Sequence, residues 1–288
     1  MNNNENLSNT SINWFPGHMK KTLEVLEEEI KYVDVVLYLV DSRAPLSSVN
    51  PEFKKIIKNK PKMYIFNKAD LVDLNELKNF YKYFEDENTI ILPLNSSLNN
   101  STQIIIKKLD ELNIRRVTRN ANKNLNIPLR IMVIGIPNVG KSTLINNMCK
   151  HSRAKTGNKP GVTKTKQWVK VNANLELLDT PGTLWPNLGN IRVAHNLAYI
   201  GSIKDEVVII SDLVYDLISD LIKLGYAKNL EDRYNIKIDG KEIIEIYDDI
   251  ALSRGFVMKN KEIDYERSAK AILTDYRSGK LGKIILDR

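Results

Sequence analysis

Short apolar runs alternate with longer amphipathic segments through the first two-thirds of the chain. Four runs have the length and composition of buried strands, at residues 33–40, 63–66, 90–94 and 129–134. Between them, apolar residues recur three or four positions apart, which predicts a helix beginning near Leu23 and helices over 74–84 and 104–112. Strands joined through helices of this length need crossover connections. We therefore expect an α/β fold with a mostly parallel sheet and helices on both faces.

The pattern becomes purely helical near residue 187. Apolar residues from Val207 to Leu224 form one long amphipathic face, and Gly225 is placed to end that helix. Further helices are predicted over 241–253 and 265–276. Earlier in the chain, runs at 168–171 and 175–178 predict a hairpin, and the polar stretches 113–128 and 151–167 read as connecting segments. These patterns predict a disordered tail at 1–11, an α/β domain at 12–186 and a small helical domain at 187–288.

Composition and charge limit the partners and the cellular compartment that we expect. The 288 residues include 43 Lys and Arg against 35 Asp and Glu, a formal charge of +8. A basic protein commonly has an acidic partner such as nucleic acid, although a Lys- and Asn-rich composition also follows from genomic base bias. No apolar run approaches the roughly 18 residues that a membrane span needs, and the single cysteine suits a reducing compartment. We expect a monomeric, cytoplasmic protein with no membrane partner.

The stretch from Gly135 to Ser142 reads Gly-Ile-Pro-Asn-Val-Gly-Lys-Ser and lies between a predicted strand and a predicted helix. Phosphate binds such a loop because free backbone N–H groups at the helix start point at its oxygens, while glycine lets the main chain come close. In this arrangement Lys141 reaches the terminal phosphates and the Ser142 hydroxyl holds Mg²⁺. The predicted phosphate-binding residues are Asn138, Val139, Gly140, Lys141, Ser142 and Thr143.

Further polar motifs follow other predicted strands. Asn67-Lys68-Ala69-Asp70 matches the Asn-Lys-x-Asp motif, whose aspartate can accept hydrogen bonds from the N1 and exocyclic amine donors of guanine, so GTP rather than ATP is the expected ligand. Asp179-Thr180-Pro181-Gly182 matches Asp-x-x-Gly, in which the aspartate holds Mg²⁺ through water and the glycine N–H senses the γ-phosphate. A serine pair, Ser96 and Ser97, suits the loop that touches the base edge.

The order of these motifs differs from that of an ordinary GTPase, in which the phosphate loop comes first. Here the guanine motif and the serine loop precede it, as circular permutation would produce. The joint would be the connecting segment 113–128. The threonine of the first switch, another Mg²⁺ ligand, should lie between the phosphate loop and Asp179, where spacing alone leaves both Thr163 and Thr165 open.

The chain resembles the circularly permuted GTPases of the YlqF type over nearly its whole length beyond the first ten residues. The resemblance rests on the four motif loops and on further segments at 14–19, 41–45, 160–163, 185–186 and 277–282. It implies a GTP hydrolase that assists late maturation of the large (50S) ribosomal subunit, binding rRNA or the pre-50S particle in its GTP state. It also implies that Thr163 is the switch threonine and that the helical domain binds ribosomal RNA.

The same resemblance suggests roles for three other residues. His18, in Trp-Phe-Pro-Gly-His-Met, would act in place of the water-orienting glutamine of small GTPases, the alternative being a histidine that only caps the following helix. Thr183 occupies the glutamine position, where the family has an aliphatic residue. Asn138 matches the asparagine that coordinates K⁺ in potassium-dependent relatives, the alternative being an ordinary loop hydrogen bond. The expected catalytic set is His18, Lys141 and Gly182, with GTP or GDP, Mg²⁺ and K⁺ as cofactors.

Alternatives remain open at this stage. One is a permuted GTPase that serves the small subunit, an organelle or another RNA. The other is a GTP-dependent RNA-binding module with little turnover. Basic residues in the two connecting segments are candidates for contacts with RNA phosphate, or are simply solvated: Arg115, Arg116, Arg119, Lys155, Lys159, Lys164 and Lys166.

Overall fold

The computed structural model describes residues 18–109, 111–112, 127–150, 167–180, 182–185, 188 and 190–287; the side chains of 18–22, 150 and 167 are outside this description. Its strands are β1 (Val35–Asp41), β2 (Lys62–Asn67), β3 (Thr89–Leu94), β4 (Leu129–Gly135), β5 (Gln167–Asn172) and β6 (Leu175–Asp179). Helices α1 (His18–Glu29), α2 (Pro51–Ile56), α3 (Leu74–Lys78), α4 (Ser101–Leu109) and α6 (Lys141–Lys150) accompany them, together with the 3-10 turns η1 (Ile30–Tyr32), η2 (Ala69–Leu71) and η3 (Tyr81–Tyr83). The remaining elements are α7 (Ile191–Tyr199), η4 (Asp205–Val207), α8 (Ile210–Lys223), α9 (Ala227–Tyr234), α10 (Ile243–Ser253) and α11 (Tyr265–Arg277).

The six strands form one sheet in the order β3-β2-β1-β4-β6-β5. All neighbours are parallel except β5 and β6, which form the predicted antiparallel hairpin. Strands from the first half of the chain therefore lie on one side of β4, and the hairpin that follows β4 in sequence lies on the other. The predicted mostly parallel α/β sheet is confirmed.

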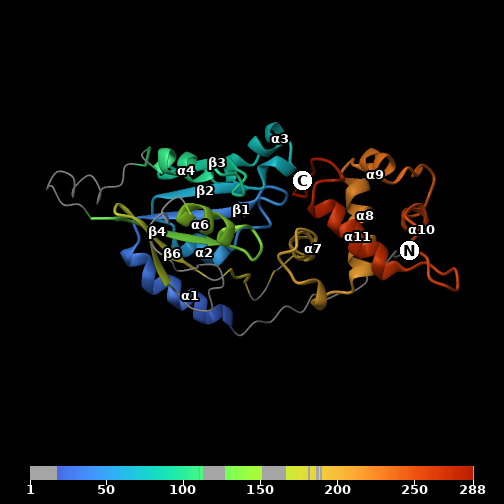
Figure 1. Ribbon diagram of the computed structural model, residues 1–288, viewed down its shortest axis with the longest axis horizontal. Helices are drawn as coiled ribbons and strands as arrows, with labels where there is room; N and C mark the ends of the chain where they lie inside the picture. The colour runs from blue at the N-terminus through green and yellow to red at the C-terminus, as the bar shows by residue number, and fades with distance from the viewer. Residues whose placement is uncertain are drawn as a thin grey trace, which may run out of the picture.

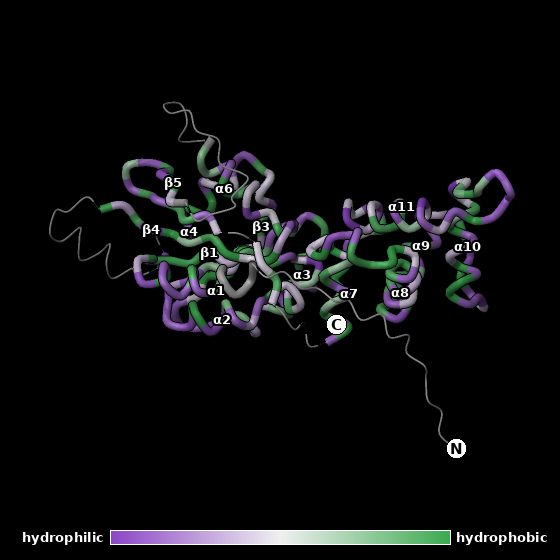
Figure 2. Tube along the Cα trace, turned by 90° about the horizontal axis from the view of Figure 1, so that it is seen from below, coloured by the Kyte–Doolittle hydropathy of each residue, from purple (hydrophilic) through white to green (hydrophobic). Residues whose placement is uncertain are grey.

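The apolar runs are continuous because both faces of the sheet are buried. Successive residues of β1 point to opposite faces: Val35, Leu37 and Leu39 join one core with helices α4 and α6, whereas Val36 and Tyr38 join a second core with α1 and α2. In Figure 1 the helices overlap the sheet, and the turned view of Figure 2 separates α6 on one side of the sheet from α1 and α2 on the other, with the apolar colouring of the central strands visible. The predicted placement of helices on both faces is confirmed.

The helical region, residues 188–287, lies at one end of the long axis of the molecule (Figure 1). Its centre is α8, which packs against α7, α10 and α11. The core on the α4 and α6 side of the sheet continues into this region through Leu197, Leu217 and Ile272, all less than 1 % exposed. The end of the chain returns to the sheet, where Ile285 is buried in the other core and the Leu286 N–H donates to the Arg43 carbonyl. A boundary near residue 187 remains a prediction, since apolar packing is continuous across it.

Some predicted elements differ in extent. The helix expected over 74–84 is two short pieces, α3 and η3. At the end of this stretch Phe84 is buried and the ring of Tyr81 packs 5.3 Å from that of Phe66, whereas Tyr83 is exposed. The long helix starts at Ile210 rather than Val207, which lies in the preceding 3-10 turn. Helix α2 was not predicted, although Asn50 caps it and Pro51 occupies its first position. In the described parts of the chain, no helix is long and apolar enough to cross a membrane.

Candidate functional site

The sheet brings the polar motifs to one edge. Because β1, β2, β3, β4 and β6 are parallel, their carboxyl ends lie together. The strand register shows which residues are neighbours at this edge. Asp41 of β1 pairs with Asn67 of β2, and Asn67 pairs with Leu94 of β3, so the serine loop begins beside the guanine motif. The phosphate loop leaves β4 next to β1, and Asp179 ends β6 on the other side of β4.

The phosphate loop wraps around a buried valine. Val139 is fully buried, and Gly140 follows with φ +106°, a conformation that residues with a Cβ rarely adopt. A Cβ at Gly140 would also lie 2.2 Å from the Asn67 side-chain nitrogen, so glycine is required on two counts. Helix α6 then starts at Lys141. Loop and helix line a cleft of about 380 Å³ with residues 179, 180 and 182.

Lys141 lies inside this cleft. Its Nζ donates to the carbonyls of Gly135 and Ile136 at 2.8 and 2.7 Å. Burial lowers the pKa of the Lys141 ammonium to about 7, although the negative charge of Asp179 opposes the shift. A Cβ at Gly182 would lie 2.5 Å from this nitrogen, so the glycine of Asp-x-x-Gly leaves room for the lysine. Two predicted catalytic residues, Lys141 and Gly182, are therefore in direct proximity.

Asn67 ties the guanine motif to both neighbouring loops. Its Nδ2 donates to the Val139 carbonyl at 2.6 Å, and its Oδ1 accepts from the Ser96 N–H at 2.8 Å. Ser96 is buried and its carbonyl accepts from Asn147 on α6 at 2.6 Å, whereas Ser97 is exposed. Asn67 is thus a connecting residue that fixes the phosphate loop and the serine loop against the guanine motif.

Lys68 and Asp70 extend from the same turn. Lys68 adopts the left-handed conformation at φ 58°, and its Nζ donates to the Asn138 carbonyl at 3.0 Å and to Asp41 at 2.8 Å. Burial lowers the pKa of the Lys68 ammonium, and Asp41 counteracts part of that effect. The Asp70 side chain is exposed, so its carboxylate is accessible to a base.

Oxygen groups suited to Mg²⁺ border the same cleft. Ser142 and Thr143 are exposed at the start of α6, and buried Asp179 ends β6. Thr180 fixes that strand end through its hydroxyl, which donates to the Val133 carbonyl at 2.6 Å. Hydroxyl and carboxylate oxygens are ligands that Mg²⁺ prefers, so Ser142 and Asp179 fit the ion. When bound, Mg²⁺ neutralises charge on the phosphates.

Other predicted site residues lie outside the described part. His18 begins α1, but its side chain is not described, and neither is any part of Thr163 or Thr165. The seven basic residues proposed for RNA contacts also lie outside the described ranges. Thr183 is buried, and its hydroxyl has no hydrogen-bond partner among the described residues, so it packs as the aliphatic residue of the family would.

Comparison with known proteins decides the family. A model for the 50S ribosome-binding GTPase family matches residues 130–249. Ribosome biogenesis GTPase A of Bacillus cereus is 39% identical over 285 residues, covering 96% of this chain and 93% of the relative. The protein of the same name from Bacillus licheniformis is also 39% identical, over 96% of this chain and 98% of the relative. The chain belongs to the ribosome biogenesis GTPase A family.

Membership in the ribosome biogenesis GTPase A family makes the chain a GTPase, which binds GTP or GDP. The fold agrees with that of GNP-bound YlqF from T. maritima, with a TM-score of 0.66 at 22% identity over 93% of this chain and 98% of that one. The family model begins at residue 130, on the strand that leads into the phosphate loop, while the guanine motif precedes it. This is the circularly permuted order.

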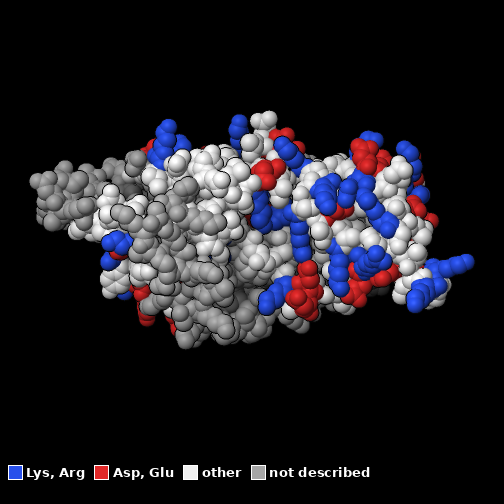
Figure 3. All heavy atoms as spheres, in the orientation of Figure 1, with Lys and Arg blue, Asp and Glu red and all other residues white. Residues whose placement is uncertain are grey.

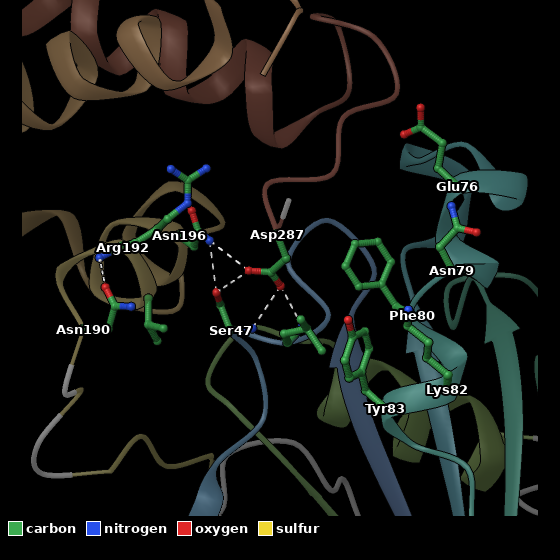
Figure 4. A pocket seen from close by; sticks show the side chains of 12 residues that line it. Ser47, Glu76, Asn79, Phe80, Lys82, Tyr83, Asn190, Arg192, Asn196 and Asp287 are labelled. Atoms are coloured by element: carbon green, nitrogen blue, oxygen red, sulfur yellow. Dashed lines mark hydrogen bonds between the residues drawn. The ribbon is translucent and has the colours of Figure 1, made fainter. Parts of the chain in front are cut away.

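A second and larger cleft, of about 710 Å³, lies between the sheet and the helical region (Figure 4). Phe80 and Tyr83 line one side and Arg192 the other. Between them lies Asp287, which accepts from the N–H groups of Leu46 and Ser47 at 2.6 and 2.9 Å and from Asn196 at 3.0 Å. Burial raises the pKa of the Asp287 carboxyl, and these hydrogen bonds oppose it. The end of the chain, at Asp287, partly fills this cleft between the sheet and the helical region. No motif in the sequence predicted the cleft.

Proposed function

We propose that this GTPase is an assembly factor for the large ribosomal subunit, which it binds through rRNA in its GTP state and leaves after hydrolysis. The observation that carries the proposal is the 39% sequence identity, over 96% of this chain, to proteins named ribosome biogenesis GTPase A. The matched family model, described as a 50S ribosome-binding GTPase, supports the large subunit in particular.

Direct contact between the phosphate loop and the helical region supports a switch. The Asn138 side chain donates to the Gly201 carbonyl at 2.7 Å, and the Ser202 hydroxyl donates to the Pro137 carbonyl at 2.9 Å. The Gly201 carbonyl and the Ser202 hydroxyl both lie in the turn that follows α7. A change at the phosphates can therefore alter how the helical region is held, in addition to the covalent link from Gly182.

A local basic surface of the helical region supports RNA as its ligand, although residues 188–287 as a whole hold 17 Asp and Glu against 15 Lys and Arg. On the face shown in Figure 3, Lys and Arg side chains gather over this region, with acidic residues among them. Lys228 and Lys280 line a shallow cleft of about 420 Å³ together with Gly282, so the Arg-Ser-Gly-Lys-Leu-Gly segment of the family resemblance borders it. Their side chains are more than half exposed, at 74% and 54%, and each forms an ion pair, Lys228 with Asp232 at 2.9 Å and Lys280 with Asp275 at 3.5 Å. Contact with RNA phosphate would replace or share these pairs.

The remaining assignments follow the family. Mg²⁺ would be held by Ser142, Thr163 and Asp179, and K⁺ by the side-chain oxygen of Asn138, an atom not used in the bond to Gly201. His18 would orient the attacking water. The protein would work as a cytoplasmic monomer.

Co-sedimentation with purified ribosomal subunits tests the proposal. We expect the protein with a non-hydrolysable GTP analogue to pellet with large subunits at least several-fold more than with GDP, and only weakly with small subunits. Lys228→Glu with Lys280→Glu should reduce pelleting, whereas Lys55→Glu, an equally exposed lysine on α2, should not. Equal pelleting in the two nucleotide states would contradict the switch, and preference for small subunits would favour the alternative partner.

A further inference from the structure

We propose that Asp41 and Arg43 are positioning residues that couple guanine-nucleotide binding to the placement of the helical region. Asp41 is the last residue of β1 and Arg43 lies in the loop that follows it, between the nucleotide site and the turn after α7. They are 1% and 2% exposed, the burial of core residues. The proposal depends on GTP binding by this family, and not on which ribosomal subunit is the partner.

Asp41 faces the nucleotide site. Its Oδ2 accepts from the Nζ of Lys68, the lysine of the guanine motif, at 2.8 Å. The same carboxylate accepts from Arg43 at 2.9 Å through Nε and 2.7 Å through a terminal nitrogen, and from the Arg43 N–H at 3.1 Å. Ser48 fixes the loop by accepting from the Asp41 N–H at 3.0 Å. Because Arg43 fixes the Asp41 carboxylate through three hydrogen bonds, the carboxylate in turn fixes the position of the Lys68 ammonium.

Arg43 faces the helical region. One terminal nitrogen, already bonded to Asp41, donates to the Ile200 carbonyl at 3.2 Å, and the other donates to the Arg277 carbonyl at 3.3 Å. The Arg277 side chain in turn donates to the carbonyls of Tyr199 and Ala198 at 2.9 and 2.8 Å. Both arginines therefore hold the C-terminal end of α7. Arg43 belongs to the segment 41–45 and Arg277 to the segment 277–282, neither of which has a role in the proposed GTPase reaction.

The contacts close into a ring. Lys68 also donates to the Asn138 carbonyl at 3.0 Å, and the Asn138 side chain donates to the Gly201 carbonyl at 2.7 Å, one residue beyond the carbonyl that Arg43 holds. The ring thus runs from guanine motif to phosphate loop, to the turn after α7, and back through Arg43 and Asp41. Every link is a hydrogen bond to an ionised group or to a backbone carbonyl, so movement of one member strains the next.

Coupling follows from this geometry. A bound guanine nucleotide contacts the loops that carry Lys68 and Asn138, and so restricts both. The turn at 200–201 is held by the same two loops, directly through Asn138 and through Arg43 by way of Asp41. Nucleotide binding should therefore stabilise the turn, and by reciprocity a fixed turn should tighten nucleotide binding. This link acts from the base side of the site and is separate from the connection through Gly182.

The test uses the full chain, GDP as ligand and amide hydrogen exchange as the readout. In the wild type, saturating GDP should slow exchange at Gly201, Ser202 and Ile203 by at least ~10-fold, since their N–H groups bond back to Ala198 and Leu197 within the turn. In Arg43→Met at equal GDP occupancy that protection should disappear, and the Kd for GDP should rise ~10-fold.

Arg233→Met is the matched control, because its Nε pairs with Asp275 at 2.9 Å within the helical region and reaches no part of the ring. It should lower thermal stability and leave the GDP-dependent protection intact. Arg43→Lys covers the case in which Arg43→Met does not fold: it can keep the pair with Asp41 while losing the reach to the Ile200 and Arg277 carbonyls. GDP affinity should then fall together with the protection, because by reciprocity both report the same coupling.

Full protection of the turn in Arg43→Met or Arg43→Lys would overturn the coupling. So would the same loss of protection in Arg233→Met, since the effect would then be general destabilisation. Failure of the wild type to bind GDP would instead contradict the assignment of the nucleotide site itself.

Discussion

The Asn67 side chain is hydrogen-bonded to the Val139 carbonyl at 2.6 Å, and this bond joins the guanine motif to the phosphate loop. The opposite end of the same amide accepts from the Ser96 N–H at 2.8 Å. One buried side chain thus holds together three loops that leave three different strands. The order of the motifs along the chain is permuted, but their arrangement around this amide does not depend on that order.

Asn67→Ala should therefore destabilise the protein and impair nucleotide binding together. It leaves a buried carbonyl and a buried N–H without their partner, at a cost of ~2–5 kcal/mol in the free energy of unfolding. Denaturant unfolding and GDP titration measure the two effects. Asn95→Ala removes a comparable amide whose partner, the Ser97 N–H, is exposed, and should cost less than ~1 kcal/mol. Equal effects of the two variants would contradict the connecting role.

Asp70→Asn should change which base is preferred. The exposed Asp70 carboxylate is expected to accept two hydrogen bonds from guanine, and an amide there presents a donor in place of one acceptor. We expect GDP affinity to fall ~100-fold, corresponding to about 3 kcal/mol, and affinity for xanthosine diphosphate to rise. Competition binding measures both, with ADP as the control ligand. Unchanged preference for guanine would show that Asp70 does not read the base.

GDP binding should take up a proton above neutral pH. The pKa of Lys141 is lowered to about 7 by burial, so above pH 7 its amine is increasingly neutral in the free protein. Polyphosphate restores the charge by pairing with the ammonium, so affinity should decrease as pH rises from 7 to 9. Calorimetry at pH 8.5 in buffers of different ionisation enthalpy should show uptake of close to one proton, and at pH 6 uptake from this group should vanish. Equal uptake at the two pH values would contradict this assignment.

Asp41 should contribute stability that is lost in acid. Burial alone would raise its pKa, but the charges of Arg43 and Lys68 outweigh burial and hold the pKa well below the usual range. The lowered value stabilises the folded state fully at pH above the unfolded pKa of about 3.9. This contribution decreases as pH falls below about 3.9 and is lost as pH falls through the lowered pKa of the folded state. Asp41→Asn should cost ~3–5 kcal/mol at pH 7, because Arg43 is left buried without its anion, and less at pH 3. A cost independent of pH would contradict this role.

Sequence reasoning predicted that the motif residues lie together because each motif is a local feature of the chain. Each motif follows a strand, and parallel strands carry their ends to one edge, so spacing and strand order sufficed to place Lys141, Asp179 and Asn67 near each other. The hairpin and the amphipathic face of α8 were equally local signals.

The contacts between the two parts of the molecule could not be predicted in the same way. Arg43 reaches carbonyls 157 and 234 residues further along the chain, and no periodicity reports such a partner. The segment at 41–45 was part of the family resemblance, but nothing in the sequence indicates that Asp41 and Arg43 form a buried pair. Asn147 on α6, which bonds to the Ser96 carbonyl, gave no signal at all.

The most direct test of the central claim is GTP hydrolysis in K⁺ buffer with and without purified large ribosomal subunits, with small subunits and ATP as controls. We expect a GTP-specific rate that large subunits raise several-fold and small subunits do not, and we expect His18→Ala to reduce the stimulated rate. A GTPase rate that large subunits leave unchanged would contradict the role in large-subunit assembly.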